Sequence, residues 1–149
     1  MDGISRWAQV LGRVALGAIF IISGLGKLAA WRGTVAYAGS KSVPEVLLAI
    51  ATALEVLGAI SIVLGLKARW GALALLIFLV PVTLVFHNFW AAPPDQQQVQ
   101  TVNFLKNLAI GGGLLIVLGR GAGAFSVDSR QTPARGEPVA VAKTTHSGV

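Results

Sequence analysis

The chain has 149 residues, of which 54% are hydrophobic and only 12% are charged, and its net charge is +6. A soluble domain of this size usually carries about 25% charged residues, so the composition indicates an integral membrane protein. The absence of cysteine excludes disulfides, iron–sulfur ligation and cysteine-based zinc sites. We therefore expect no intrinsic metal or redox cofactor. The basic residues flank apolar segments, which favours contact with membrane lipid over nucleic acid.

Four apolar segments each approach the ~20 residues that cross a ~30 Å hydrocarbon core. They cover residues 7–30, 44–66, 70–90 and 102–119. Because backbone polar groups must be satisfied inside lipid, these segments predict helices. The expected fold is all-α, an integral membrane four-helix bundle over residues 1–125, followed by a disordered cytoplasmic tail over residues 126–149. The first segment is too long for the core of a signal peptide, and Lys27 interrupts the expected cleavage region.

The connections between these segments differ in character. Residues 31–43 are a candidate for a short interfacial helix, and residues 91–101 predict a polar loop. Ser42 and Glu45 have the spacing of a capping box, with Pro44 at an early helical position, and so predict the start of the second span.

The placement of Lys and Arg predicts the orientation. Basic residues concentrate on the cytoplasmic side of membrane proteins, and eight of the twelve fall on the side that holds both termini. We therefore expect a multi-pass protein of the bacterial inner membrane with both termini in the cytoplasm. The cytoplasmic set is Arg6, Arg13, Lys67, Arg69, Arg120, Arg130, Arg135 and Lys143, and the opposite set is Lys27, Arg32, Lys41 and Lys106.

Glu55 stands alone in the second apolar segment. It would lie about 16 Å deep, near the bilayer midplane, at ~1.5 Å of rise per residue. A charged side chain at that depth costs roughly 2.5–3.5 kcal/mol on insertion scales unless it faces a partner or water. Such a residue is a hypothesis for a functional site.

Most other polar residues within the spans would lie in the outer half of the membrane, the half that faces away from the cytoplasm. Lys106 would lie about 8 Å deep on a long flexible stem, and we expect it to be the first partner of Glu55, with Lys27 second. A cluster with two lysines would suit an anionic or carbonyl-bearing ligand. The expected intramembrane polar cluster consists of Glu55, Lys106, Lys27, His87, Asn103, Asn107 and Ser23.

Each of these residues also has a purely structural interpretation. Polar side chains in membrane helices often only hydrogen-bond a neighbouring helix, worth about 0.6 kcal/mol each. An ion pair can fix the register of a bundle, and Lys27 could extend to the membrane surface. For one residue alone the structural interpretation is favoured, whereas the one-sided cluster as a whole favours a functional site.

Five stretches in order, residues 12–28, 55–58, 64–69, 104–109 and 121–128, together with His87 at the end of the third span, resemble the DoxX family of small four-helix bacterial membrane proteins. The resemblance covers residues 6–128. Together with the polar cluster, the resemblance implies an accessory or quinone-interacting subunit of a membrane oxidoreductase system, with a quinone as a ligand and an oxidoreductase as a partner. A second copy of the chain is a further candidate partner. No catalytic motif is present, so we do not expect a catalyst on its own and assign no catalytic residue. The alternatives are a permeability module for protons or small solutes, and a non-catalytic membrane scaffold.

Overall fold

The computed structural model describes residues 3–123 and 125–131, and these residues form helices and no strand. Four helices are long and apolar enough to cross a membrane, which confirms the predicted all-α four-helix bundle. The elements are α1 (Gly3–Ala29), α2 (Trp31–Ser40), α3 (Glu45–Leu64), α4 (Ala68–Phe86), the 3₁₀ helix η1 (Phe89–Ala91), α5 (Pro94–Arg120) and α6 (Val127–Gln131).

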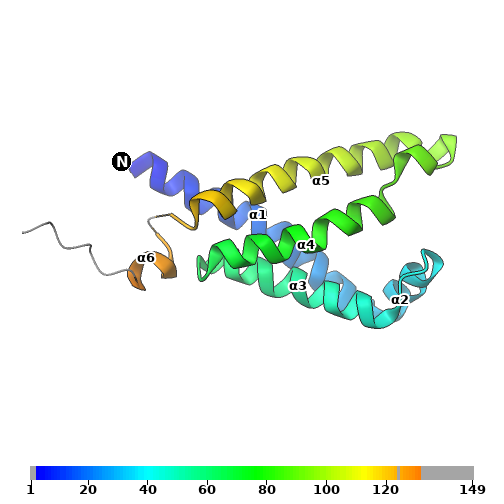
Figure 1. Cartoon of the computed structure of the whole chain (residues 1–149), viewed down its shortest axis with the longest axis horizontal. Helices are drawn as coiled ribbons and strands as arrows, with labels where there is room; N and C mark the ends of the chain where they lie inside the picture. Colours follow the sequence, from blue (N-terminus) through cyan, green and yellow to red (C-terminus); the bar gives the residue numbers. More distant parts are fainter. Residues whose placement is uncertain (1–2, 124, 132–149) are drawn as a thin grey trace, which may run out of the picture.

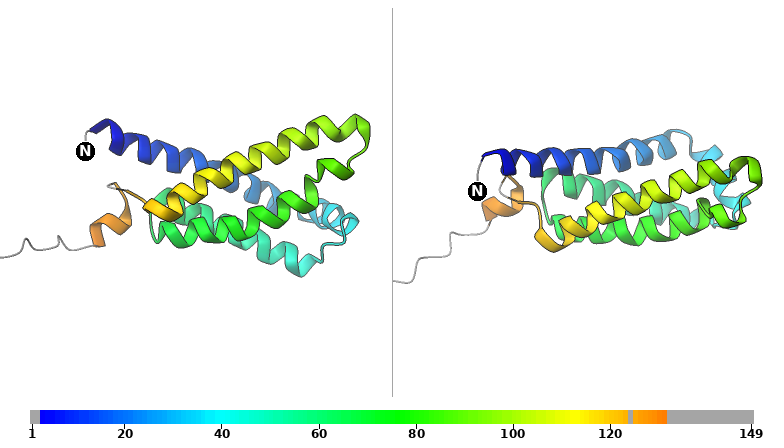
Figure 2. Two further views of the ribbon diagram at one scale, coloured as in Figure 1. Left: turned by 45° about the horizontal axis from the view of Figure 1, so that its top comes forward. Right: turned by 90° about the horizontal axis from the view of Figure 1, so that it is seen from above.

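The four long helices run up and down, so that the chain returns to the end from which it started (Figure 1). In the bundle α3 packs against both α1 and α4, and α5 packs mainly against α4. The start of α1 and α6 lie at one end, here named the α6 end. The connection from α4 to α5 and helix α2 lie at the other, named the α2 end (Figure 2).

The core is densest towards the α6 end, where Ile62, Leu75 and Leu114 are fully buried. Small residues allow the helices to approach closely there. A Cβ added to Gly58 would lie 2.9 Å from Leu75 Cγ and 3.0 Å from the Gly71 carbonyl oxygen. Many Leu, Ile and Val side chains on the outside of the bundle remain exposed, as a surface in contact with lipid requires.

The expected interfacial helix is present as α2, but the predicted capping box is wrong. Ser42 has a positive φ of 59°, and α3 begins after Pro44 without a side-chain cap. The residue before a proline avoids helical backbone angles, so Val43 cannot open the helix and Ser42 cannot cap it. Glu45 Oε1 instead accepts a hydrogen bond from Trp31 Nε1 at 2.9 Å, which ties α2 to the start of α3.

Two further boundaries differ from the prediction. Helix α5 begins at Pro94, so most of the predicted polar loop at residues 91–101 is helical. A helix that projects beyond the hydrocarbon core needs no apolar residues, and its polar first turns resemble a loop in sequence. Residues 127–131 of the predicted disordered tail form α6. The remainder of that predicted tail, residues 132–149, lies outside the described residues.

Candidate functional site in the α2 half of the bundle

Glu55 lies in the middle of α3 and is 1% exposed. Its Oε2 accepts a hydrogen bond from Lys27 Nζ at 2.6 Å, an ion pair between α1 and α3. The prediction that Glu55 is paired is confirmed, whereas the preference for Lys106 as its first partner is wrong. An isolated carboxylate would be costly to bury, so this ion pair explains how Glu55 is accommodated.

Helix packing selects Lys27 over Lys106. Helix α1 packs directly on α3, whereas α5, which carries Lys106, packs mainly on α4. Gly24, nearly one turn before Lys27, allows the close approach of α1. A Cβ at this position would lie 2.5 Å from Val56 Cγ2 and 3.5 Å from Glu55 Oε2. The short distance between α1 and α3 brings Lys27 Nζ to the carboxylate.

Two more side chains surround the Lys27 ammonium group. Lys27 Nζ donates a hydrogen bond to Ser23 Oγ at 2.9 Å, as their i, i+4 spacing allows. It also lies 5.1 Å from the ring centroid of Phe78 on α4, within the range of a cation–π interaction. The sequence did not single out Phe78, because an aromatic residue in an apolar span is normally a core residue. The ammonium group thus has partners from α1, α3 and α4.

The polar residues of α5 divide between two environments. Lys106 Nζ donates a hydrogen bond to Asn103 Oδ1 at 3.1 Å. Asn107 is buried and donates from Nδ2 to Thr83 Oγ1 of α4 at 3.0 Å. The Thr83 hydroxyl in turn donates to the Leu79 carbonyl oxygen at 2.7 Å. Asn107 therefore joins two helices, whereas Lys106 has an amide oxygen, not a carboxylate, as its hydrogen-bond acceptor.

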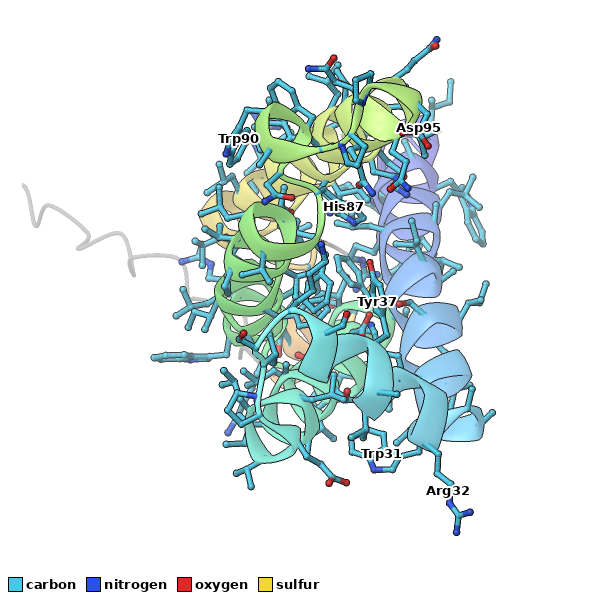
Figure 3. All side chains as sticks on the ribbon, turned by 90° about the vertical axis from the view of Figure 1, so that its right-hand side faces the viewer. Trp31, Arg32, Tyr37, His87, Trp90 and Asp95 are labelled. Atoms are coloured by element: carbon cyan, nitrogen blue, oxygen red, sulfur yellow. The ribbon has the colours of Figure 1, made fainter. Side chains whose placement is uncertain are left out.

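His87 directly follows α4, as the C-cap residue of that helix. Its Nδ1 lies 2.9 Å from Gln100 Oε1 on α5, so the imidazole bridges the two helices at the α2 end. Seen from that end, His87 and Tyr37 lie towards the middle of the bundle, whereas Arg32 points away from it (Figure 3). The ring of Tyr37 lies 5.5 Å from that of Phe86, which brings α2 against the end of α4.

The Lys27–Glu55 pair and several of the side chains around it line a cavity of about 650 Å³, named here the Glu55 cavity. Six of the seven residues in the predicted cluster contribute to its lining, and the seventh, Asn103, bonds to one of them. Most of the remaining lining is apolar. Three polar lining residues were not predicted from the sequence: Thr34 and Tyr37, which come from α2, and Thr52, which lies one turn before Glu55 on α3 within an apolar stretch. The predicted residues in the lining are Ser23, Lys27, Glu55, His87, Lys106 and Asn107.

The chemistry of the Glu55 cavity follows from its charges. Lys27 and Glu55 neutralise each other, so the further positive charge in the described lining is that of Lys106, whose ammonium group donates to an amide oxygen. Ligand pockets are typically 300–1,000 Å³ with apolar walls and a few polar groups that orient the ligand. The arrangement suits a largely apolar ligand with an oxygen acceptor. Within residues 3–123 and 125–131, no three His, Asp or Glu side chains are grouped to hold a metal ion.

A bundle of four apolar helices that encloses such a site defines a small multi-pass membrane protein. The DoxX family profile matches residues 8–88. The chain is 36% identical over 123 residues to the inner membrane protein YphA of Escherichia coli, covering 81% of this chain and 88% of that protein. It is 32% identical over 119 residues to the inner membrane protein YqjF of the same organism, covering 80% and 88%. The chain therefore belongs to the DoxX family and is an integral inner-membrane protein.

The similarity also extends to eukaryotic proteins, over a shorter stretch. The chain is 32% identical over 80 residues to the Surfeit locus protein 4 homolog of Schizosaccharomyces pombe, covering 52% of this chain and 26% of that protein. No solved structure matches the chain. The region of this chain that the family profile matches contains Ser23, Lys27, Glu55 and His87 and ends before α5, so it covers the ion pair but not Lys106.

Proposed function

We propose that this protein binds a quinone or a similar carbonyl-bearing apolar ligand in the Glu55 cavity, as an accessory component of a membrane oxidoreductase system. The observation that carries the proposal is an apolar cavity of about 650 Å³ into which Lys106 brings a positive charge. A quinone ring is flat and apolar, and its two carbonyl oxygens accept hydrogen bonds. Such a ligand matches both the walls of the cavity and its cation.

The positions of the polar groups support this choice. Lys106 on α5 lines the cavity and can donate a hydrogen bond to a carbonyl oxygen, and His87 at the end of α4 adds a second polar side chain to the lining. The ring of Phe78 also lies in the lining, next to the Lys27–Glu55 pair. An aromatic ring beside polar donors favours a planar ligand, because offset stacking adds to the burial of apolar area.

The chain has no cysteine and no grouped metal ligands among its described residues. In an oxidoreductase system the electrons would therefore pass through the bound quinone and the cofactor of a partner protein. This chain would bind and orient the quinone and shield it from water. That role requires no catalytic residue in the chain itself.

Binding of a short-chain quinone analogue to the purified protein in lipid nanodiscs tests the proposal. We expect saturable binding to the unmodified protein and at least tenfold weaker binding to Lys106→Met, because the methionine removes the cation and keeps a similar apolar stem. Lys41→Met is the matched control, since Lys41 lies at the same end of the molecule and outside the cavity lining. Equal affinity in Lys106→Met and Lys41→Met would overturn the site, and absence of saturable binding would overturn the function.

A permeability module for protons or small solutes is the second candidate, because an ion pair lies midway along α3 beside a cavity. Packing on the α6 side of Glu55 favours binding over permeation. Ile62, Leu75 and Leu114 are fully buried there, so an apolar core fills the half of the bundle that a permeating solute would have to cross. Flux of protons and candidate solutes into proteoliposomes distinguishes the two. We expect flux at the level of empty liposomes, and flux above it that is lost in Glu55→Gln would favour permeation.

A further inference from the structure

A second cavity of about 380 Å³ lies at the α6 end, opposite the end that contains the Glu55 cavity. It is open to the surface, and its lining comes from the link between α3 and α4, the C-terminal end of α5 and the segment that leads into α6. Three of its lining side chains are cationic. The lining consists of Lys67, Arg69, Trp70, Arg120, Gly121, Ala122, Gly123, Asp128 and Ser129.

The three cations come from separate places in the chain and are brought together by the fold. Lys67 lies in the link between α3 and α4 and has a positive φ of 49°, an uncommon conformation for a residue with a side chain. Arg69, in the first turn of α4, donates from Nη2 to the Gly119 carbonyl oxygen at 3.1 Å, which fixes its guanidinium group against α5. Arg120 is the last residue of α5.

The carboxylate in this lining binds to backbone groups. Asp128 Oδ1 accepts from the Lys67 N–H at 2.7 Å, and Oδ2 accepts from the Ala68 N–H at 3.1 Å. Both oxygens therefore accept hydrogen bonds from backbone N–H groups at the start of α4, which have no acceptor within the helix. One carboxylate against three cations leaves the cavity with a net positive charge.

The position of the cavity relative to the membrane points to the type of ligand. Trp70 belongs to the lining, is 71% exposed and lies at the beginning of a membrane-spanning helix. Exposed tryptophans at such positions lie at the level of the lipid headgroups. Basic pockets between transmembrane helices at this level bind anionic headgroups, and guanidinium groups match the geometry of phosphate oxygens.

We infer that the cavity at the α6 end binds the phosphate group of an anionic ligand, and that the side chains of Lys67, Arg69 and Arg120 contact that phosphate. An anionic phospholipid in the adjoining leaflet presents such a group at the correct depth, and a soluble phosphate ester presents the same chemistry from the aqueous side. This inference is independent of the proposed function, because it concerns different residues at the opposite end of the bundle.

Native mass spectrometry of the delipidated protein in detergent tests this inference with three probes: phosphatidylglycerol, phosphatidylcholine and glycerol phosphate. We expect phosphatidylglycerol to be retained in preference to phosphatidylcholine. In the triple variant Lys67→Gln, Arg69→Gln, Arg120→Gln we expect at least fivefold weaker retention. The matched control is the double variant Arg32→Gln, Lys41→Gln, which removes basic residues from the α2 end and should retain phosphatidylglycerol as the unmodified protein does.

The probes also separate the two sources of phosphate. Binding of glycerol phosphate that competes with the lipid and is lost in the triple variant would assign the cavity to a soluble phosphate ester, and so support the same site. Equal retention of both lipids, or equal loss of phosphatidylglycerol in the triple and control variants, would overturn the inference. Thermal unfolding shows whether the triple variant is folded. If it is not, the single variant Arg120→Gln takes its place, and we expect that variant to weaken retention about twofold.

Discussion

At the scale of single residues, the Lys27–Glu55 pair should dominate the polar contribution to stability. Glu55 is 1% exposed, so Lys27→Met would leave a buried carboxylate without its cation. Loss of one partner from a buried pair costs about 3–5 kcal/mol. We expect a clearly lower midpoint of thermal unfolding in detergent for Lys27→Met, because this variant leaves the uncompensated charge on Glu55.

Lys106→Met is the matched control for this prediction. Its Nζ donates to Asn103 Oδ1, not to a carboxylate, so its removal should change the unfolding midpoint little. The double variant Lys27→Met, Glu55→Leu should recover much of the stability lost in Lys27→Met, since it removes both charges. A larger loss for Lys106→Met than for Lys27→Met would contradict the assignment of the pair.

The existence of this pair could be predicted from sequence, but the partner could not. A lone carboxylate in an apolar span must be compensated, whatever the fold. The choice between Lys27 and Lys106 depends on which helix lies beside α3, and residue depth says nothing about that. Gly24 carried the relevant signal, because it marks the face on which α1 approaches its neighbour, but the chain contains 18 glycines and most have no such role.

At the scale of helices, Gly24 controls the distance between α1 and α3. In Gly24→Ala the new Cβ would lie 2.5 Å from Val56 Cγ2 and would push α1 away from Glu55. Overpacking of this kind costs about 1–3 kcal/mol. We expect Gly24→Ala to lower the unfolding midpoint. Gly26→Ala on the same helix, whose Cβ would meet nothing within 4 Å, should be neutral or stabilising by up to about 1 kcal/mol. Equal effects of the two substitutions would exclude close helix approach as the cause.

Helix α6 should stabilise the bundle through its single carboxylate. The Asp128 side chain caps the start of α4, and its backbone N–H donates to the Gly65 carbonyl oxygen at 2.9 Å. Loss of a side-chain cap typically costs about 1 kcal/mol. We expect Asp128→Ala to lower the free energy of unfolding by about that amount, measured by chemical denaturation in detergent, and Asp128→Asn to lose less, because the amide oxygen still accepts one hydrogen bond. Identical losses in the two variants would argue against the cap.

Sequence patterns predicted the four spans because ~20 apolar residues in a row have few alternatives in lipid. They failed for α6 and for the first turns of α5, which are polar. Helicity in α6 depends on contacts across the chain, such as Asp128 with the backbone of residues 67 and 68. No local pattern reports a contact over that sequence distance.

At the scale of the whole molecule, the two ends have different chemistry. The α6 end gathers Lys67, Arg69 and Arg120 around a small polar cavity. The α2 end carries a larger, mainly apolar cavity beside α2. The Lys27–Glu55 pair lines the larger cavity at the middle of α3, and the packed core fills the half of the bundle towards the α6 end. A ligand that enters from the α2 end would therefore meet the polar groups before the closed core.

The concentration of basic residues at the α6 end predicts that this end faces the cytoplasm. Because the chain has no cysteine, a single introduced cysteine reports its own location. Gly3 and Gly39 lie at opposite ends of the bundle, and a Cβ at either would meet nothing within 4 Å, so both tolerate substitution. In intact cells we expect a membrane-impermeant thiol reagent to label Gly39→Cys, and to label Gly3→Cys only after the membrane is permeabilised. The reverse pattern would place the Glu55 cavity on the cytoplasmic side, and the ligand would then have to reach it from there.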